Sequence, residues 1–110
     1  MIRLIFCILL LGAAFPSRAE TQLVVPSDSK AQYFVLEKGG KGAERTIVTK
    51  RVGPNETVFS RRRYNCKSAT VKYLGTGDTL EAMGKSKPDP AIGPIVQGSI
   101  AYYVGQEACR

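Results

Sequence analysis

The side chains that most often perform acid–base catalysis are scarce in this chain of 110 residues. It contains no histidine, which removes the commonest general base and the commonest metal ligand. A serine or cysteine nucleophile would therefore have no histidine to activate it. The only aspartates are Asp28, Asp78 and Asp89, which suit supporting roles. We expect a protein that is not an enzyme, with no catalytic residue, no metal site and no cofactor.

The first 19 residues have the pattern of a secretory signal peptide. Arg3 precedes an apolar run over residues 4–14, and the segment ends in the small-residue pattern Ser17-Arg18-Ala19. The run is too short to cross a membrane, and no second apolar stretch follows it. Cys7 lies inside the run behind a bulky residue, which does not fit a lipid anchor. We predict cleavage after Ala19, no membrane span, and a periplasmic or secreted location.

Two cysteines, Cys66 and Cys109, remain after the signal peptide. In an oxidising compartment they have only each other, so we expect a structural disulfide between them. The alternatives are a redox pair or a metal site, but the sequence has no C-x-x-C motif and no histidine for a zinc site. In the chain-entropy model, closing a loop of this length stabilises a fold by ~4 kcal/mol.

Basic residues are concentrated in the middle of the chain. Removal of the signal peptide leaves 14 basic and nine acidic side chains, a net charge of +5. Residues 45–72 carry one acidic side chain, Glu56, and eight basic ones, which are Arg45, Lys50, Arg51, Arg61, Arg62, Arg63, Lys67 and Lys72. The segments on either side each carry a net charge of −1, so we expect the folded molecule to be polarised.

Apolar periodicity and turn residues predict one small α+β domain over residues 32–110, after a flexible leader over residues 20–31. The expected strands are 32–38, 45–52, 57–66 and 69–74, with turns at the glycine-rich residues 39–42, at 53–56 and at 67–68. A short helix with Asp78 as its cap and Gly84 at its end follows, then a proline-rich surface crossover over residues 85–98. Ser99 caps a C-terminal helix, although Tyr102 to Val104 would also suit a strand. The predicted fold is an antiparallel β-meander of three to five strands, with one disulfide attaching the helix.

The turns also set the register between neighbouring strands. The turn at 67–68 places Tyr64 opposite Val71 and Cys66 opposite Ala69, on the core side of the sheet. Arg62 points to the same side, where it would lie at an edge or meet a carboxylate.

The opposite side of the sheet then presents Arg63 directly across from Lys72, and Lys50 beside Phe59. Like charges that face each other without an acidic neighbour are destabilising, so an anion between them would be favourable. The candidate anion-binding residues are Lys50, Arg61, Arg63 and Lys72. The alternative is a solvated strand face whose charges protect an exposed edge from pairing.

Export removes the protein from most nucleic acid, so the expected partner is an acidic protein, a polysaccharide or an anionic lipid surface. The first hypothesis is an exported, non-enzymatic binding module. The alternative is a periplasmic structural or accessory component of an envelope assembly, with the helix and the proline-rich crossover as its contact surface. A hydrolase or hydrolase inhibitor fits less well, because the chain lacks a general base and is basic overall.

Three features resemble the surface-adhesin protein E type of domain from proteobacteria. They are Arg63-x-x-Cys66, the following strand that ends at Tyr73-Leu74, and Gly98-Ser99-Ile100-Ala101 before Ala108-Cys109. The resemblance covers roughly residues 45–109. It implies a small envelope-associated domain with a curved antiparallel sheet and an attached C-terminal helix, and an adhesin-like role in binding host matrix proteins. The chain differs in having no lipobox, the motif that surface display by a lipid anchor would need.

Overall fold

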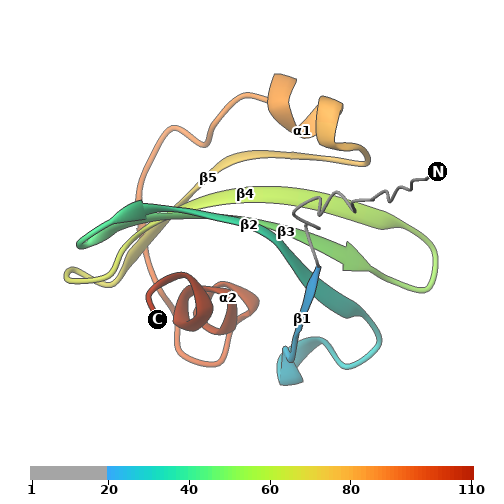
Figure 1. The fold of residues 1–110 in the computed structure, drawn as a ribbon, viewed down its shortest axis with the longest axis horizontal. Coiled ribbons are helices and arrows are strands. Elements are labelled where there is room, and N and C mark those ends of the chain that lie inside the picture. The colour runs from blue at the N-terminus through green and yellow to red at the C-terminus, as the bar shows by residue number, and fades with distance from the viewer. Residues whose placement is uncertain (1–19) are drawn as a thin grey trace, which may run out of the picture.

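The computed structural model describes residues 20–110, so the predicted signal peptide lies outside the described residues. The described chain forms one antiparallel sheet of six strands, which lie side by side in chain order. Two helices, α1 and α2, cover opposite faces of this curved sheet (Figure 1). The predicted α+β meander with a C-terminal helix is confirmed, with six strands where three to five were expected.

Four long strands make the body of the sheet, and they are β2 (Gln32–Lys41), β3 (Glu44–Val52), β4 (Thr57–Asn65) and β5 (Thr70–Gly77). The predicted tight turn between β3 and β4 is closed by Gly53, whose N–H donates to the carbonyl of Glu56 over 2.8 Å. The connection between β4 and β5 spans residues 66–69 rather than two residues, and Ala69 adopts a φ of 57°. The predicted register is nevertheless correct, because Tyr64 pairs with Val71.

Strand β2 is longer than predicted, because Gly39 and Gly40 continue it instead of ending it. Gly40 pairs with Arg45 at a φ of 84°, and a Cβ at this position would collide with the backbone of Glu44. Glycine therefore permits a close approach of β2 to β3 that other residues would prevent. The expectation that this glycine-rich stretch stops the strand is wrong.

Residues 20–31, predicted as a flexible leader, are instead part of the domain. They contain β1 (Thr21–Leu23), which pairs with β2, and a short 3₁₀ helix (Pro26–Asp28). The carboxylate of Asp28 accepts hydrogen bonds from Arg51 Nε and from the Tyr33 hydroxyl, each over 2.6 Å. These bonds hold the pKa of Asp28 below its usual range, and the bond from Arg51 makes the larger contribution. Burial and the bond to Asp28 raise the pKa of Tyr33 to about 12.

Helix α1 (Leu80–Lys85) begins one residue later than predicted and extends past Gly84. Its cap is Thr79 rather than Asp78, because the Thr79 hydroxyl accepts the N–H of Ala82 over 3.0 Å. The predicted crossover follows, and it contains a two-residue strand, β6 (Gly93–Pro94), that pairs with β5.

Helix α2 (Ile100–Ala108) begins after the predicted Ser99 cap, whose hydroxyl accepts the N–H of Tyr102 over 3.1 Å. It packs on the concave face of the sheet (Figure 1). The buried core there consists of Val35, Ile47, Tyr64, Val104 and Ala108. The Tyr64 ring is fully buried, and its hydroxyl donates to the carbonyl of Ala101 over 2.7 Å. This core therefore depends on a close contact between β4 and α2.

Candidate anion-binding face

Strand β4 separates its three consecutive arginines between the two faces of the sheet. Its buried residues Ser60, Arg62 and Tyr64 alternate with the less buried Arg61 and Arg63. Since successive side chains of a strand point to opposite faces, Arg61 and Arg63 lie on the side away from α2. A run that reads as one basic cluster in the sequence is therefore two separate features in the fold.

The side away from α2 carries all four candidate residues, and we call Lys50, Arg61, Arg63 and Lys72 the basic face. The predicted pairing of Arg63 with Lys72 is observed, as is that of Lys50 with Phe59. Phe59 lies four positions from Arg63 on β4, which places Lys50 about 13 Å away along the strand direction. The fold thus brings Arg63 and Lys72 together and leaves Lys50 at the far end of the face.

Three glutamates pair with this face, and the expectation that it has no acidic neighbour is wrong. The pairs and their N–O distances are Lys50–Glu20 at 3.0 Å, Arg61–Glu37 at 3.8 Å and Arg63–Glu44 at 3.8 Å. Two of these acids lie on β2 and β3, and the β2–β3 register is interrupted after Val35. The turn residues set the register of only the two following hairpins, β3–β4 and β4–β5. The sequence therefore could not predict which glutamates lie beside the basic residues.

Lys72 forms no ion pair among residues 20–110. It shares with Arg63 a pocket of about 290 Å³. Ser68 and Thr70 line the same pocket, and their hydroxyl oxygens lie 3.0 Å apart. Glu44 is the one acidic residue of the lining, so the net charge of the pocket lining is +1. Two cations, two hydroxyls and one removable carboxylate can hold a single anionic group.

Asn65 orders the edge of this pocket. Its side-chain oxygen accepts the N–H groups of Lys67 and Ser68 over 3.0 and 2.9 Å, which fixes the turn after β4. Its amide nitrogen donates to Glu44 over 2.9 Å. Glu44 and Arg63 are both well exposed, and exposed ion pairs contribute only about 0–1 kcal/mol. An incoming anion can therefore replace Glu44 beside Arg63 at little cost, while Asn65 retains the glutamate.

The third arginine, Arg62, points toward the α2 side, as predicted, but no carboxylate of residues 20–110 forms an ion pair with it. It is 3% exposed and donates to the hydroxyls of Thr49 and Tyr73, over 2.9 and 2.7 Å. The expectation of an edge position or an acidic partner is wrong, because β4 lies inside the sheet and the hydrogen-bond partners of Arg62 on β3 and β5 are neutral hydroxyl groups. The chain thus buries a guanidinium among hydroxyl groups.

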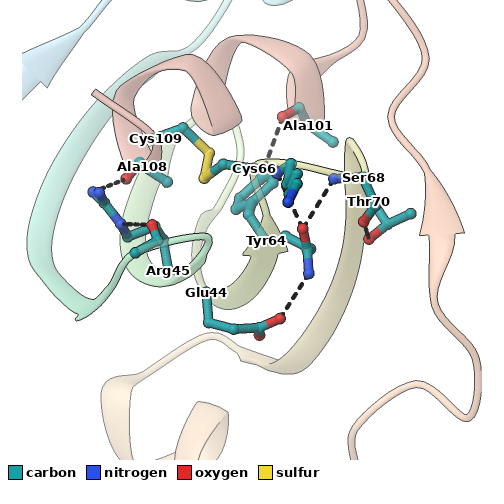
Figure 2. Close-up of a disulfide and its surroundings, with 12 residues drawn as sticks. Glu44, Arg45, Tyr64, Cys66, Ser68, Thr70, Ala101, Ala108 and Cys109 are labelled. Atoms are coloured by element: carbon teal, nitrogen blue, oxygen red, sulfur yellow. Dashed lines mark hydrogen bonds between the residues drawn. A yellow bond between two sulfur atoms is a disulfide. The ribbon is translucent and has the colours of Figure 1, made fainter.

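The predicted disulfide between Cys66 and Cys109 is present, and it joins the end of β4 to the end of α2 (Figure 2). Both cysteines pack against the core that contains Tyr64 and Val104. Disulfides persist in oxidising compartments, so this bond indicates an extracytoplasmic location.

Within residues 20–110, no group of three or more acidic, cysteine or histidine side chains could hold a metal ion. The helices of this part of the chain are too short to span a membrane. Comparison with protein-family models, with curated proteins and with solved structures finds no match for this chain. The resemblance to a surface adhesin therefore stays a prediction.

Proposed function

We propose that this protein is an exported, non-enzymatic binding module whose basic face takes an acidic polysaccharide. The observation that carries the proposal is the Arg63–Lys72 pair, in which Lys72 forms no ion pair within residues 20–110 and lies beside the Ser68 and Thr70 hydroxyls. Sulfate and carboxylate groups of such a polymer accept charge-assisted hydrogen bonds from both cations. The hydroxyl groups of its sugars match the serine and threonine of the pocket.

Export belongs to the same proposal. A signal peptide cleaved after Ala19 would deliver the chain to the periplasm or the exterior, where the disulfide is stable. Glu20 would then be the first residue, and its side chain pairs with Lys50. Intact mass of the exported protein tests this step, because a retained Met1 or an attached lipid would contradict it.

Binding to a heparin-type polysaccharide at low salt tests the pocket. Lys72→Ala should weaken binding about tenfold, equivalent to ~1.4 kcal/mol, because it removes one charge-assisted contact. Lys87→Ala is the matched control, since Lys87 is exposed in the crossover and outside the pocket. Both variants lose one positive charge. If they weaken binding equally, the attraction comes from net charge and the pocket has no role.

A second candidate function is an accessory component of an envelope assembly. It is supported by two exposed apolar side chains in the proline-rich crossover, Ile92 and Val96, which are 56% and 65% exposed. A photo-crosslinker in place of Val96 would test this candidate in exporting cells. A discrete adduct absent at position 87 would support it, whereas no adduct at either position would count against it.

A further inference from the structure

A positive charge that has no acidic partner in the described part of the chain, residues 20–110, is buried on the α2 side of the sheet. Arg62 is 3% exposed, and its two hydrogen bonds run to neutral oxygens on Thr49 and Tyr73. Its Nε–H has no hydrogen-bond partner. No acidic side chain among residues 20–110 forms an ion pair with it.

Arginine side chains are positively charged in proteins, so Arg62 brings a full charge into this buried position. Burial of an ion is unfavourable unless an opposite charge or a full set of hydrogen bonds compensates it. The Tyr73 ring, whose centroid lies 4.5 Å from the guanidinium carbon, supplies a partial cation–π compensation. The remaining donors of Arg62 leave room for an anion.

A pocket of about 250 Å³ gives access to this charge. The buried side chains of its lining are Tyr33, Thr49, Ser60 and Arg62, and they form its floor. Glu56 is exposed and lies at its rim. The pocket is therefore a recess lined by hydroxyl groups and apolar atoms, with the Arg62 cation among its buried residues.

The charges of the lining define the ligand. Arg51 also lines the pocket, but Asp28 neutralises it through bonds of 2.6 and 3.2 Å. Arg62 is then the one uncompensated cation, and Glu56 at the rim disfavours a second negative charge. Val58 and Ile100 add apolar surface to the wall. These features fit a single carboxylate that carries a short apolar group.

We propose that this pocket binds a small monocarboxylic acid, with its carboxylate on Arg62. A planar carboxylate matches the parallel N–H donors of a guanidinium. Nε–H is buried and has no partner among residues 20–110, so binding requires a small movement of the pocket lining that exposes this donor. The Ser60 hydroxyl, buried beside Arg62 on the same side of β4, can donate to the same carboxylate. The site lies on the opposite side of the sheet from the basic face and does not rest on the polysaccharide-binding proposal.

The exported, disulfide-bonded protein and sodium butyrate provide the test. Butyrate should raise the melting temperature saturably, because a ligand that binds only the folded state stabilises it by mass action. The amide resonances of Thr49, Ser60 and Arg62 should shift with the same apparent affinity. Butyramide, which is neutral, and sodium chloride at equal ionic strength are the controls. A response to butyrate no larger than the response to sodium chloride overturns the proposal.

Two variants separate the pocket from general folding effects. Arg62→Met should abolish the butyrate response while keeping or raising the melting temperature, because it removes an uncompensated buried charge. Thr76→Trp should also abolish the response, since Thr76 is an exposed residue of the lining and a large side chain there would block the entrance. A response that persists in the folded Thr76→Trp protein places butyrate elsewhere and overturns the proposal, even if Arg62→Met does not fold.

Glu56→Gln distinguishes a ligand site from an internal ion pair. If the proposal is correct, removal of this rim charge tightens butyrate binding by a factor of about two to five. If Glu56 instead serves as the counter-ion of Arg62 in solution, the variant loses stability and its butyrate affinity does not increase. The second result overturns the proposal.

Discussion

The contact between Gly105 and Tyr64 leads to a sharp prediction about stability. Gly105 lies inside α2, directly against the buried ring of Tyr64. A Cβ on residue 105 would lie 2.7 Å from Cε1 of the ring, 3.1 Å from Cδ1 and 3.3 Å from Cζ. Carbon atoms normally pack at about 3.5–4.0 Å, so in Gly105→Ala the ring or the helix must move by nearly ~1 Å.

Neither partner is free to move that far. The Tyr64 ring is fully buried, and its hydroxyl is bonded to Ala101 of the same helix. The disulfide at Cys109 fixes the end of that helix to the end of β4. Overpacking costs about 1–3 kcal/mol, and the severity of this clash favours the upper end. Alanine favours a helix over glycine by ~1 kcal/mol, which leaves a net loss of about 2 kcal/mol.

Thermal and urea unfolding monitored by circular dichroism measure this loss. For a domain of this size it corresponds to a fall in melting temperature of roughly 8–16 °C. The matched control is Gly84→Ala in α1, where an added Cβ meets no atom within 4 Å. That variant should gain about 0.5–1 kcal/mol, because only the backbone effect remains.

The same substitution should therefore change stability in opposite directions at the two positions. In a Tyr64→Leu background the cost of Gly105→Ala should shrink by at least about 1 kcal/mol, since contacting residues couple. A Gly105→Ala protein as stable as the wild type would refute the packing argument. So would a cost that does not depend on residue 64.

Two further predictions concern the elements that attach the ends of the domain. Replacing Cys66 and Cys109 together by serine should lower the free energy of unfolding by ~4 kcal/mol in the loop-closure treatment, and an unchanged urea midpoint would contradict it. Because Arg51 depresses the pKa of Asp28, the stability from this pair is present above the unfolded pKa of ~4 and is lost as pH falls through the lower folded pKa. Asp28→Asn should flatten that acid-side fall in melting temperature, and exposed Asp89→Asn should preserve it; equal profiles for the two variants would exclude the pair as the cause.

Local sequence signals were sufficient for the β3–β4 hairpin, for the pairing of β4 with the start of β5, and for the start of α2. The turn residues at 53–56 fix the β3–β4 register through the Gly53–Glu56 hydrogen bond, and the alternation along β4 follows. Ser99 accepts a helix N–H, as a serine before an apolar helical pattern predicts. The disulfide was predictable because only two cysteines, Cys66 and Cys109, follow the predicted signal peptide. Each of these features depends on residues that are close in sequence or have no competing partner.

Features that depend on distant pairing were not predictable in this way. The leader is ordered because Asp28 meets Arg51, 23 residues away, and nothing in its own composition indicates this contact. Two glutamates of the basic face, Glu37 and Glu44, come from the pair of strands whose register is shifted after Val35. Gly40 continues a strand because it packs closely against β3, whereas its residue type alone favours a turn.

The three arginines of β4 show how these two kinds of information combine. Arg61 and Arg63 are partly exposed and have glutamate partners, whereas the buried Arg62 has no acidic partner among the described residues, 20–110. The net charge of the chain therefore does not indicate at which arginine an anion would bind most favourably. Salt screens exposed charges over a Debye length of about 8 Å at physiological ionic strength, and screens buried charges much less. Polysaccharide binding at the basic face should fall steeply with added salt, and butyrate binding at Arg62 should change little, so one titration of each ligand tells the two sites apart.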